Sequence, residues 1–218
     1  MDVGLKGRKV AILAADGVED AQLLEPQRAL DAAGAQTEVI APSEGSIQSS
    51  REGAKGDRIP VAHALANASA ATYDAVLLPG GSESATTLRQ DARAIQFIRE
   101  MMLADKPVAA IAEGTLLLVQ ADAVAGRTVA TVHALRAEVE GAGGQPVDEP
   151  VHADDRLVTS RKSKDLAFFS KRVVREFGNR IEDARVDQLS EASFPASDPP
   201  PGPSAVGGEG ASTTAPTR

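Results

Sequence analysis

The chain has 218 residues, 42% of them hydrophobic, which is enough for one domain with a sizeable core. Its net charge of −8 argues against nucleic acid as a partner, because phosphate binding needs clustered lysines and arginines. It contains no cysteine, which excludes disulfides, thiolate metal sites and cysteine catalysis. No run approaches the roughly 18 apolar residues of a membrane span, and the start lacks a signal-peptide core. A cytoplasmic protein without a membrane partner is therefore predicted.

The chain opens with a strand–helix–strand pattern. Residues 9–15 form a Val/Ile/Leu run that ends at Asp16-Gly17, which indicates a strand and its turn. Leucines at helical spacing predict a helix over residues 20–33, and residues 37–41 predict a second strand. The unit has the size of a right-handed βαβ crossover.

Residues 43–65 interrupt that pattern. Their β-like pieces around Ile47 and residues 59–61 indicate a small hairpin rather than another crossover. Residues 75–78 then predict a buried strand that runs into residues 79–81, Pro-Gly-Gly.

Strands and helices alternate again in the second half of the chain. The predicted elements are helices at residues 92–103, 115–121, 135–141 and 165–177, with strands at residues 108–112, 128–132 and 157–159. The alternation is typical of a doubly wound α/β sheet, and valine, leucine, isoleucine and alanine suit its core, since aromatic residues are only 3%. The predicted domain spans residues 6–185. Residues 190–218 are rich in Pro, Gly, Ser and Thr without periodicity, which predicts a disordered tail.

Three predicted strand ends could bind a ligand, because open α/β sheets bind ligands at the carboxyl ends of their strands. These ends lie at residues 16–19, 79–81 and 113–114. The N–H groups of Gly80, Gly81 and the helix start at Thr115 could bind an anion. The alternative is that the glycines only make tight turns.

The stretch PVAAIAEGTL, residues 107–116, has the pattern of a buried strand that delivers a residue to a sharp turn. That residue is Ala112, followed by Glu113. A methyl group can neither attack a carbonyl nor be activated by a base. The Thr115 hydroxyl lies on the same turn, and we expect it to cap the following helix.

Seven blocks of sequence resemble, in order, the PfpI family of the class I glutamine amidotransferase-like superfamily. They are VAILAADGVED, LEP, KGDRIPV, YDAVLLPGG, KPVAAIAEG, GAGGQPVDEPV and LVTSRKSKDL, and they extend from about Lys6 to Phe177. The resemblance implies a flavodoxin-like three-layer sandwich with a mostly parallel sheet.

The resemblance also implies a nucleophilic cysteine at the elbow, where the family usually reads Ala-Ile-Cys-His-Gly. Ala112 stands at the cysteine position and Glu113 at the histidine position. Glu19 matches the family's supporting glutamate, and the Gly80–Gly81 pair would supply oxyanion-type donors. His133 follows a predicted strand, and we interpret it as a partly buried or interface histidine rather than a base.

A second hypothesis concerns Glu19 and Glu113, which would be close together if both lie at the elbow. Two carboxylates in one small pocket should raise the pKa of one of them, and the pair could bind a cation or act as acid and base. The favoured alternative has Glu113 pointing to solvent or to an arginine across a dimer interface. The sequence contains no metal motif, and no cofactor is predicted.

Taken together, the sequence predicts a degenerate, non-catalytic family member with a stress-associated binding or scaffolding role for a small-molecule ligand or a partner. The predicted ligand-binding residues are Glu19, Gly80, Gly81, Glu113, Gly114, Thr115 and His133. The alternative is a hydrolase, glyoxalase or deglycase that acts through Glu19, Glu113 and water without a covalent intermediate. A third hypothesis is a structural dimer module whose acidic tail tethers a partner. A homo-oligomer, dimeric or larger, is implied by the resemblance alone.

Overall fold

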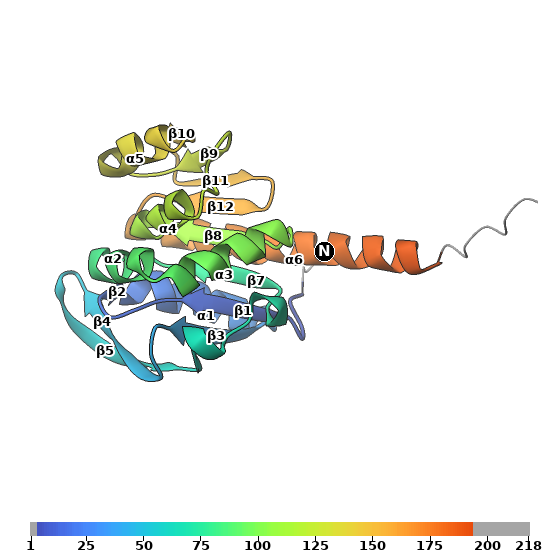
Figure 1. Ribbon diagram of the computed structural model, residues 1–218, viewed down its shortest axis with the longest axis horizontal. Coiled ribbons are helices and arrows are strands. Elements are labelled where there is room, and N and C mark those ends of the chain that lie inside the picture. The colour runs from blue at the N-terminus through green and yellow to red at the C-terminus, as the bar shows by residue number, and fades with distance from the viewer. Residues whose placement is uncertain (1–3, 194–218) are drawn as a thin grey trace, which may run out of the picture.

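The structure is a computed structural model that describes residues 4–193, with the backbone alone described at residues 180 and 182–193. Seven strands form its main sheet (Figure 1). In spatial order they are β11 (Val151–Asp154), β12 (Leu157–Ser160), β8 (Val108–Ile111), β7 (Ala75–Leu78), β1 (Lys9–Leu13), β3 (Gln36–Ala41) and β6 (His63–Ala64). Strand β11 is antiparallel to β12, and the other neighbouring strands are parallel.

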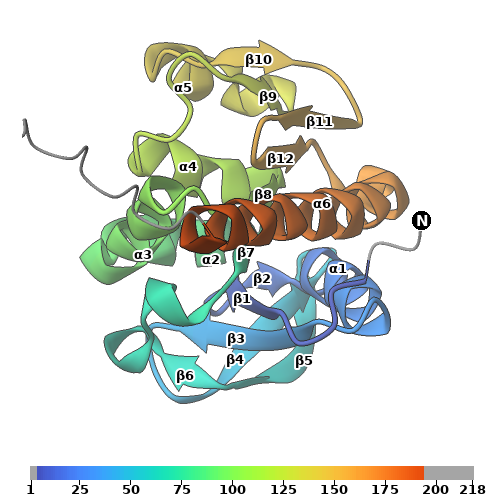
Figure 2. The ribbon, with the colours of Figure 1, turned by 90° about the vertical axis from the view of Figure 1, so that its right-hand side faces the viewer.

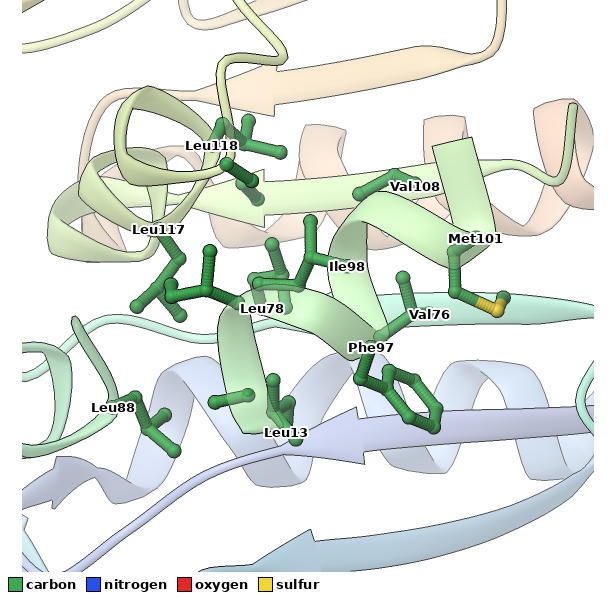
Figure 3. Close-up of a cluster of buried hydrophobic side chains, with 14 of the residues drawn as sticks. Leu13, Val76, Leu78, Leu88, Phe97, Ile98, Met101, Val108, Leu117 and Leu118 are labelled. Carbon is green, nitrogen blue, oxygen red and sulfur yellow. The ribbon is translucent and has the colours of Figure 1, made fainter. Parts of the chain in front are cut away.

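Helices cover both faces of this sheet (Figure 2). They are α1 (Asp20–Ala32) and α6 (Leu166–Ser193) on one face, and α2 (Ser82–Gln90), α3 (Ala92–Leu103) and α4 (Thr115–Gln120) on the other. Successive residues of β1 belong to opposite cores, because side chains alternate along a strand. Val10 packs with the α1–α6 core and Ala11 with the α2–α4 core. Figure 3 shows part of the second core, where Leu78 of β7 lies near Ile98 and Leu117.

Two smaller sheets flank the main one. The first contains β2 (Val18–Glu19), β4 (Gly45–Arg51) and β5 (Ala54–Val61), and its β4–β5 pair is antiparallel. The second pairs β9 (Thr128–Ala130) with β10 (Gln145–Val147) in parallel, beside α5 (Arg136–Gly141). The predicted hairpin is thus confirmed.

The flavodoxin-like three-layer α/β sandwich with a mostly parallel sheet is confirmed. Two predicted elements differ in extent or place. The strand predicted at residues 128–132 is β9, which lies outside the main sheet, and the helix predicted at residues 165–177 continues as α6 to Ser193. Helix α2 was not predicted, because its sequence SESATTLRQ contains few apolar residues from which to detect a period.

The predicted tail falls largely outside the described residues. Its first residues, 190–193, are the last of α6, and residues 194–218 are not described. Between residues 4 and 193, no helix is both long enough and apolar enough to span a membrane.

Candidate functional site

A strained elbow joins β8 to α4. After Ile111 the chain makes a short 3-10 turn, Ala112–Gly114, and continues directly into α4. Ala112 is buried and has a φ of +50°, a left-handed conformation that costs a residue other than glycine about 1–3 kcal/mol. The chain therefore makes a strained turn at the end of β8 and places the methyl group of Ala112 there.

Gly114 lets this elbow pack closely against the end of β7. A Cβ at this position would contact the carbonyl oxygen of Leu78 and lie 3.0 Å from that of Pro79. Because both are backbone atoms, no side-chain movement could make room. Gly114 is buried in this packing and does not line the cleft described below.

The half-buried Glu113 side chain points back to the start of α2. Its Oε2 accepts a hydrogen bond from the Gly81 N–H at 3.1 Å, and its Oε1 lies 3.5 Å from the Ser82 hydroxyl. Glu113 thus does not simply point to solvent, and the arginine across a dimer interface stays a prediction. The physical reason is that the first N–H groups of a helix lack intrahelical partners and attract a carboxylate.

Gln22 engages the neighbouring backbone donor. Its Oε1 accepts a hydrogen bond from the Gly80 N–H at 2.9 Å, and its Nε2 donates to Ser163 Oγ at 2.9 Å. Two of the three N–H groups suggested as anion donors, those of Gly80 and Gly81, thus bind side chains of the protein itself. The third, that of Thr115, donates to the backbone carbonyl of Ala112.

Glu19 lies at the start of α1, where its Oε1 accepts a hydrogen bond from the Glu52 N–H at 3.4 Å. Burial raises the pKa of Glu19 above its ordinary value, and the negative charges of Asp20, Glu52 and Glu113 raise it further, whereas the Glu52 N–H opposes the shift. The predicted raised pKa is therefore present, but burial contributes more than Glu113 does.

Glu19 and Glu113 both line a cleft of about 690 Å³. Its carboxylate-bearing residues are Glu19, Asp20, Glu52, Glu83 and Glu113. Arg51 also lines the cleft, but its Nε contacts Asp20 at 2.6 Å and its Nη2 contacts Asp57 at 2.8 Å. The lining is thus acidic, with its arginine already paired.

Besides Gly114, three more predicted site residues do not line the cleft: Gly80, Thr115 and His133. Thr115 is fully buried, and its hydroxyl has no hydrogen-bond partner among the described residues, so the predicted cap is wrong. Its φ of −60° and ψ of −28° already place it inside the helix, whereas an N-cap residue needs an extended backbone. His133 is exposed in a 3-10 turn after β9, outside the cleft lining, which corrects the expectation that it is partly buried and leaves the interface alternative as a prediction. Among the side chains that the structure describes, no three His, Asp or Glu residues lie close enough together to hold a metal ion.

An ion-pair network holds Ser163 beside Gln22. Arg161 donates from Nε and Nη2 to the buried Asp165 carboxylate at 3.0 and 3.2 Å, and from Nη1 to Asp148 at 2.6 Å. The two carboxylates raise the pKa of Arg161, and its guanidinium lowers the pKa of Asp148. The segment belongs to the block LVTSRKSKDL, in which the sequence predicted no site residue.

The doubly wound α/β sandwich is a flavodoxin-like fold. It has a strained elbow at the end of β8 and a cleft beside it that Glu113 lines. The sequence model of the DJ-1/PfpI family matches residues 8–176, and the chain belongs to this family. General stress protein 18 of Bacillus subtilis is 34% identical over 166 residues, which cover 76% of this chain and 95% of that protein. An uncharacterized protein of Staphylococcus epidermidis is 38% identical over 171 residues, which cover 78% of this chain and 97% of that protein.

Solved structures agree with this assignment. A two-domain protein from Anabaena variabilis, with DJ-1/ThiJ/PfpI-like and ferritin-like domains, is 29% identical with a TM-score of 0.73. The match covers 78% of this chain and 48% of that one. DJ-1beta of Drosophila melanogaster shares the fold at 19% identity and a TM-score of 0.72, covering 84% of this chain and 97% of that one.

The raised pKa of Glu19 predicts a pH-dependent effect of Glu19→Gln. Because the folded-state pKa lies above the unfolded value, the ionised carboxylate destabilises the fold at neutral pH. This penalty disappears as the pH falls below the ordinary value of 4.5. We expect Glu19→Gln to be more stable than the parent at pH 7, by less than about 1 kcal/mol for a partly exposed group, and equal to it at low pH. Melting temperatures measured across this range check the prediction, and a difference that does not change with pH would contradict it.

Proposed function

We propose that this DJ-1/PfpI-family protein lacks cysteine-type turnover and uses its elbow cleft to bind a small molecule without covalent chemistry. The observation that carries the proposal is Ala112, buried at φ +50° where a nucleophile would stand. Covalent catalysis of the family type needs a thiolate, and the whole chain contains no cysteine.

The backbone donors beside the elbow support the same proposal. An oxyanion site requires donors that are free to receive developing negative charge. Here the Gly80 N–H is bound to Gln22 and the Gly81 N–H to Glu113. A stress-associated role is supported by the relationship to the Bacillus subtilis protein named general stress protein 18.

A second candidate function is favoured by the raised pKa of Glu19 in the cleft. A carboxyl group whose pKa approaches the working pH is a better general acid or base. In this version Glu19 and Glu113 would activate a water molecule, and the protein would be a hydrolase, glyoxalase or deglycase without a covalent intermediate.

The two candidates are separated by assaying the purified chain and its Glu19→Gln variant with methylglyoxal and with a reporter peptide. The binding role predicts that neither substrate is consumed above the background of Glu19→Gln, and that intact mass shows no adduct specific to the cleft. Turnover by the parent that Glu19→Gln abolishes would establish the second candidate and refute the binding role.

We also infer a cytoplasmic homo-oligomer, which rests on the resemblance to the family. Analytical ultracentrifugation of the full chain tests the assembly, with a dimer or larger species expected.

The structural dimer module remains the third hypothesis for the chain. In that hypothesis the acidic tail tethers a partner, which is tested by deleting the residues after Leu189. If the shortened chain keeps every partner, the tail is not the tether.

A further inference from the structure

Glu113 has the position and charge of a carboxylate ligand inside its own cleft. Its Oε2 accepts the Gly81 N–H at 3.1 Å, and its Oε1 faces the Ser82 hydroxyl at 3.5 Å. These donors begin α2, where an incoming anion would find both an N–H group and the favourable end of the helix dipole. A ligand carboxylate that used them would first have to displace Glu113.

Two donors near Gly81, the Gly80 N–H and Arg51, are already paired within the protein. The Gly80 N–H is held by the buried Gln22 side chain, which is itself anchored to Ser163. The cleft's arginine, Arg51, is paired with Asp20 and Asp57. A ligand carboxylate would therefore find the Gly80 and Gly81 N–H groups and Arg51 already paired, in a cleft lined by Glu19 and other acids.

We propose that Glu113 determines the charge selectivity of the cleft: its carboxylate occupies the Gly81 and Ser82 donors, so the cleft accepts uncharged or cationic ligands and excludes carboxylates. The inference rests on the proposed binding role and specifies its ligand class. Glu113 acts here by direct competition for the same N–H group that a ligand anion would need.

The test follows the backbone amide signal of Gly81 by NMR during titration with acetate at constant ionic strength. In the parent protein we expect no saturable shift of this signal. In Glu113→Ala the signal should shift saturably. The Kd for acetate should be at least about tenfold lower than the limit set by the titration of the parent, because one competing charged hydrogen bond has been removed.

Glu83→Ala is the matched control. Glu83 lines the same cleft, so its removal lowers the negative charge by the same amount but leaves Glu113 on Gly81. We expect Glu83→Ala to behave as the parent does. Equal acetate binding by both variants would reduce the effect to general charge and overturn the proposal, as would the lack of a saturable shift in a folded Glu113→Ala.

The titration of the unaltered protein tests the proposal without any variant. Saturable acetate binding at Gly81 in that protein would refute the proposal by itself. The readout is also independent of turnover. Product formation in the assay with methylglyoxal would refute the proposed binding function and would leave the charge selectivity at Gly81 unchanged.

Discussion

Gly81→Ala is expected to lower the free energy of unfolding by about 3 kcal/mol or more, because two penalties fall on one position. Gly81 has a φ of +114°, which residues with a Cβ rarely adopt. A Cβ there would also contact the carbonyl oxygen of Gly17 and lie 2.7 Å from the Glu19 nitrogen. Both are backbone atoms of the loop before α1, and Glu19 N already donates to Gly80 O at 3.1 Å. Relief would therefore require this loop to move away from the start of α2.

Gly126→Ala is the control for backbone strain alone. Gly126 has a φ of +73°, but a Cβ there would meet nothing within 4 Å. We expect a loss of only about 1–2 kcal/mol, the cost of a left-handed conformation without a clash. Urea denaturation of both variants measures the difference, and equal losses would show that the close approach at Gly81 contributes nothing.

Arg161→Met is expected to lower the free energy of unfolding by clearly more than the loss of a surface ion pair does, since it leaves the buried Asp165 carboxylate without its cation. Asp165 ends the 3-10 turn Ser163–Asp165, which connects β12 to α6. The same turn supplies the hydroxyl that anchors Gln22. The variant should therefore also shift the amide signal of Gly80, whose N–H donates a hydrogen bond to Gln22 Oε1.

Two comparisons separate this effect from the loss of an ordinary surface charge. Arg93→Met breaks an exposed ion pair with Asp91, and we expect little or no change in the free energy of unfolding, because solvent screens such a pair. Adding Asp165→Asn to Arg161→Met removes the unpaired charge and should recover part of the loss. If Arg161→Met costs no more than Arg93→Met in chemical denaturation, the network does not stabilise the fold.

The sequence allowed prediction of most of the main sheet, because strands buried on both faces appear as nearly continuous apolar runs. Residues 75–78 and 108–111 are such runs, and both are strands in the structure. Short elements with mixed composition escaped this reasoning. Helix α2 was missed for that reason, although its start supplies the donors that bind Glu113.

The orientation of site side chains depended on contacts that sequence proximity does not reveal. The Gln22–Ser163 hydrogen bond joins residues 141 positions apart, and Gly81 and Glu113 are 32 positions apart. The family resemblance indicated that Glu19, Gly81 and Glu113 belong to one site, but not that Glu113 would bind Gly81. Thr115 was misinterpreted as a cap because its helical backbone conformation could not be inferred from residue type.

The most direct measurement compares the parent with Ala112→Cys combined with Glu113→His, side by side, by methylglyoxal consumption and intact mass. Under the proposed function the elbow is retained, whereas the thiol and the imidazole of the family are both replaced, at Ala112 and Glu113. We therefore expect no turnover by the parent and a gain of turnover, with a covalent adduct at residue 112, in the double variant. Turnover by the parent at the rate of the double variant would contradict the account.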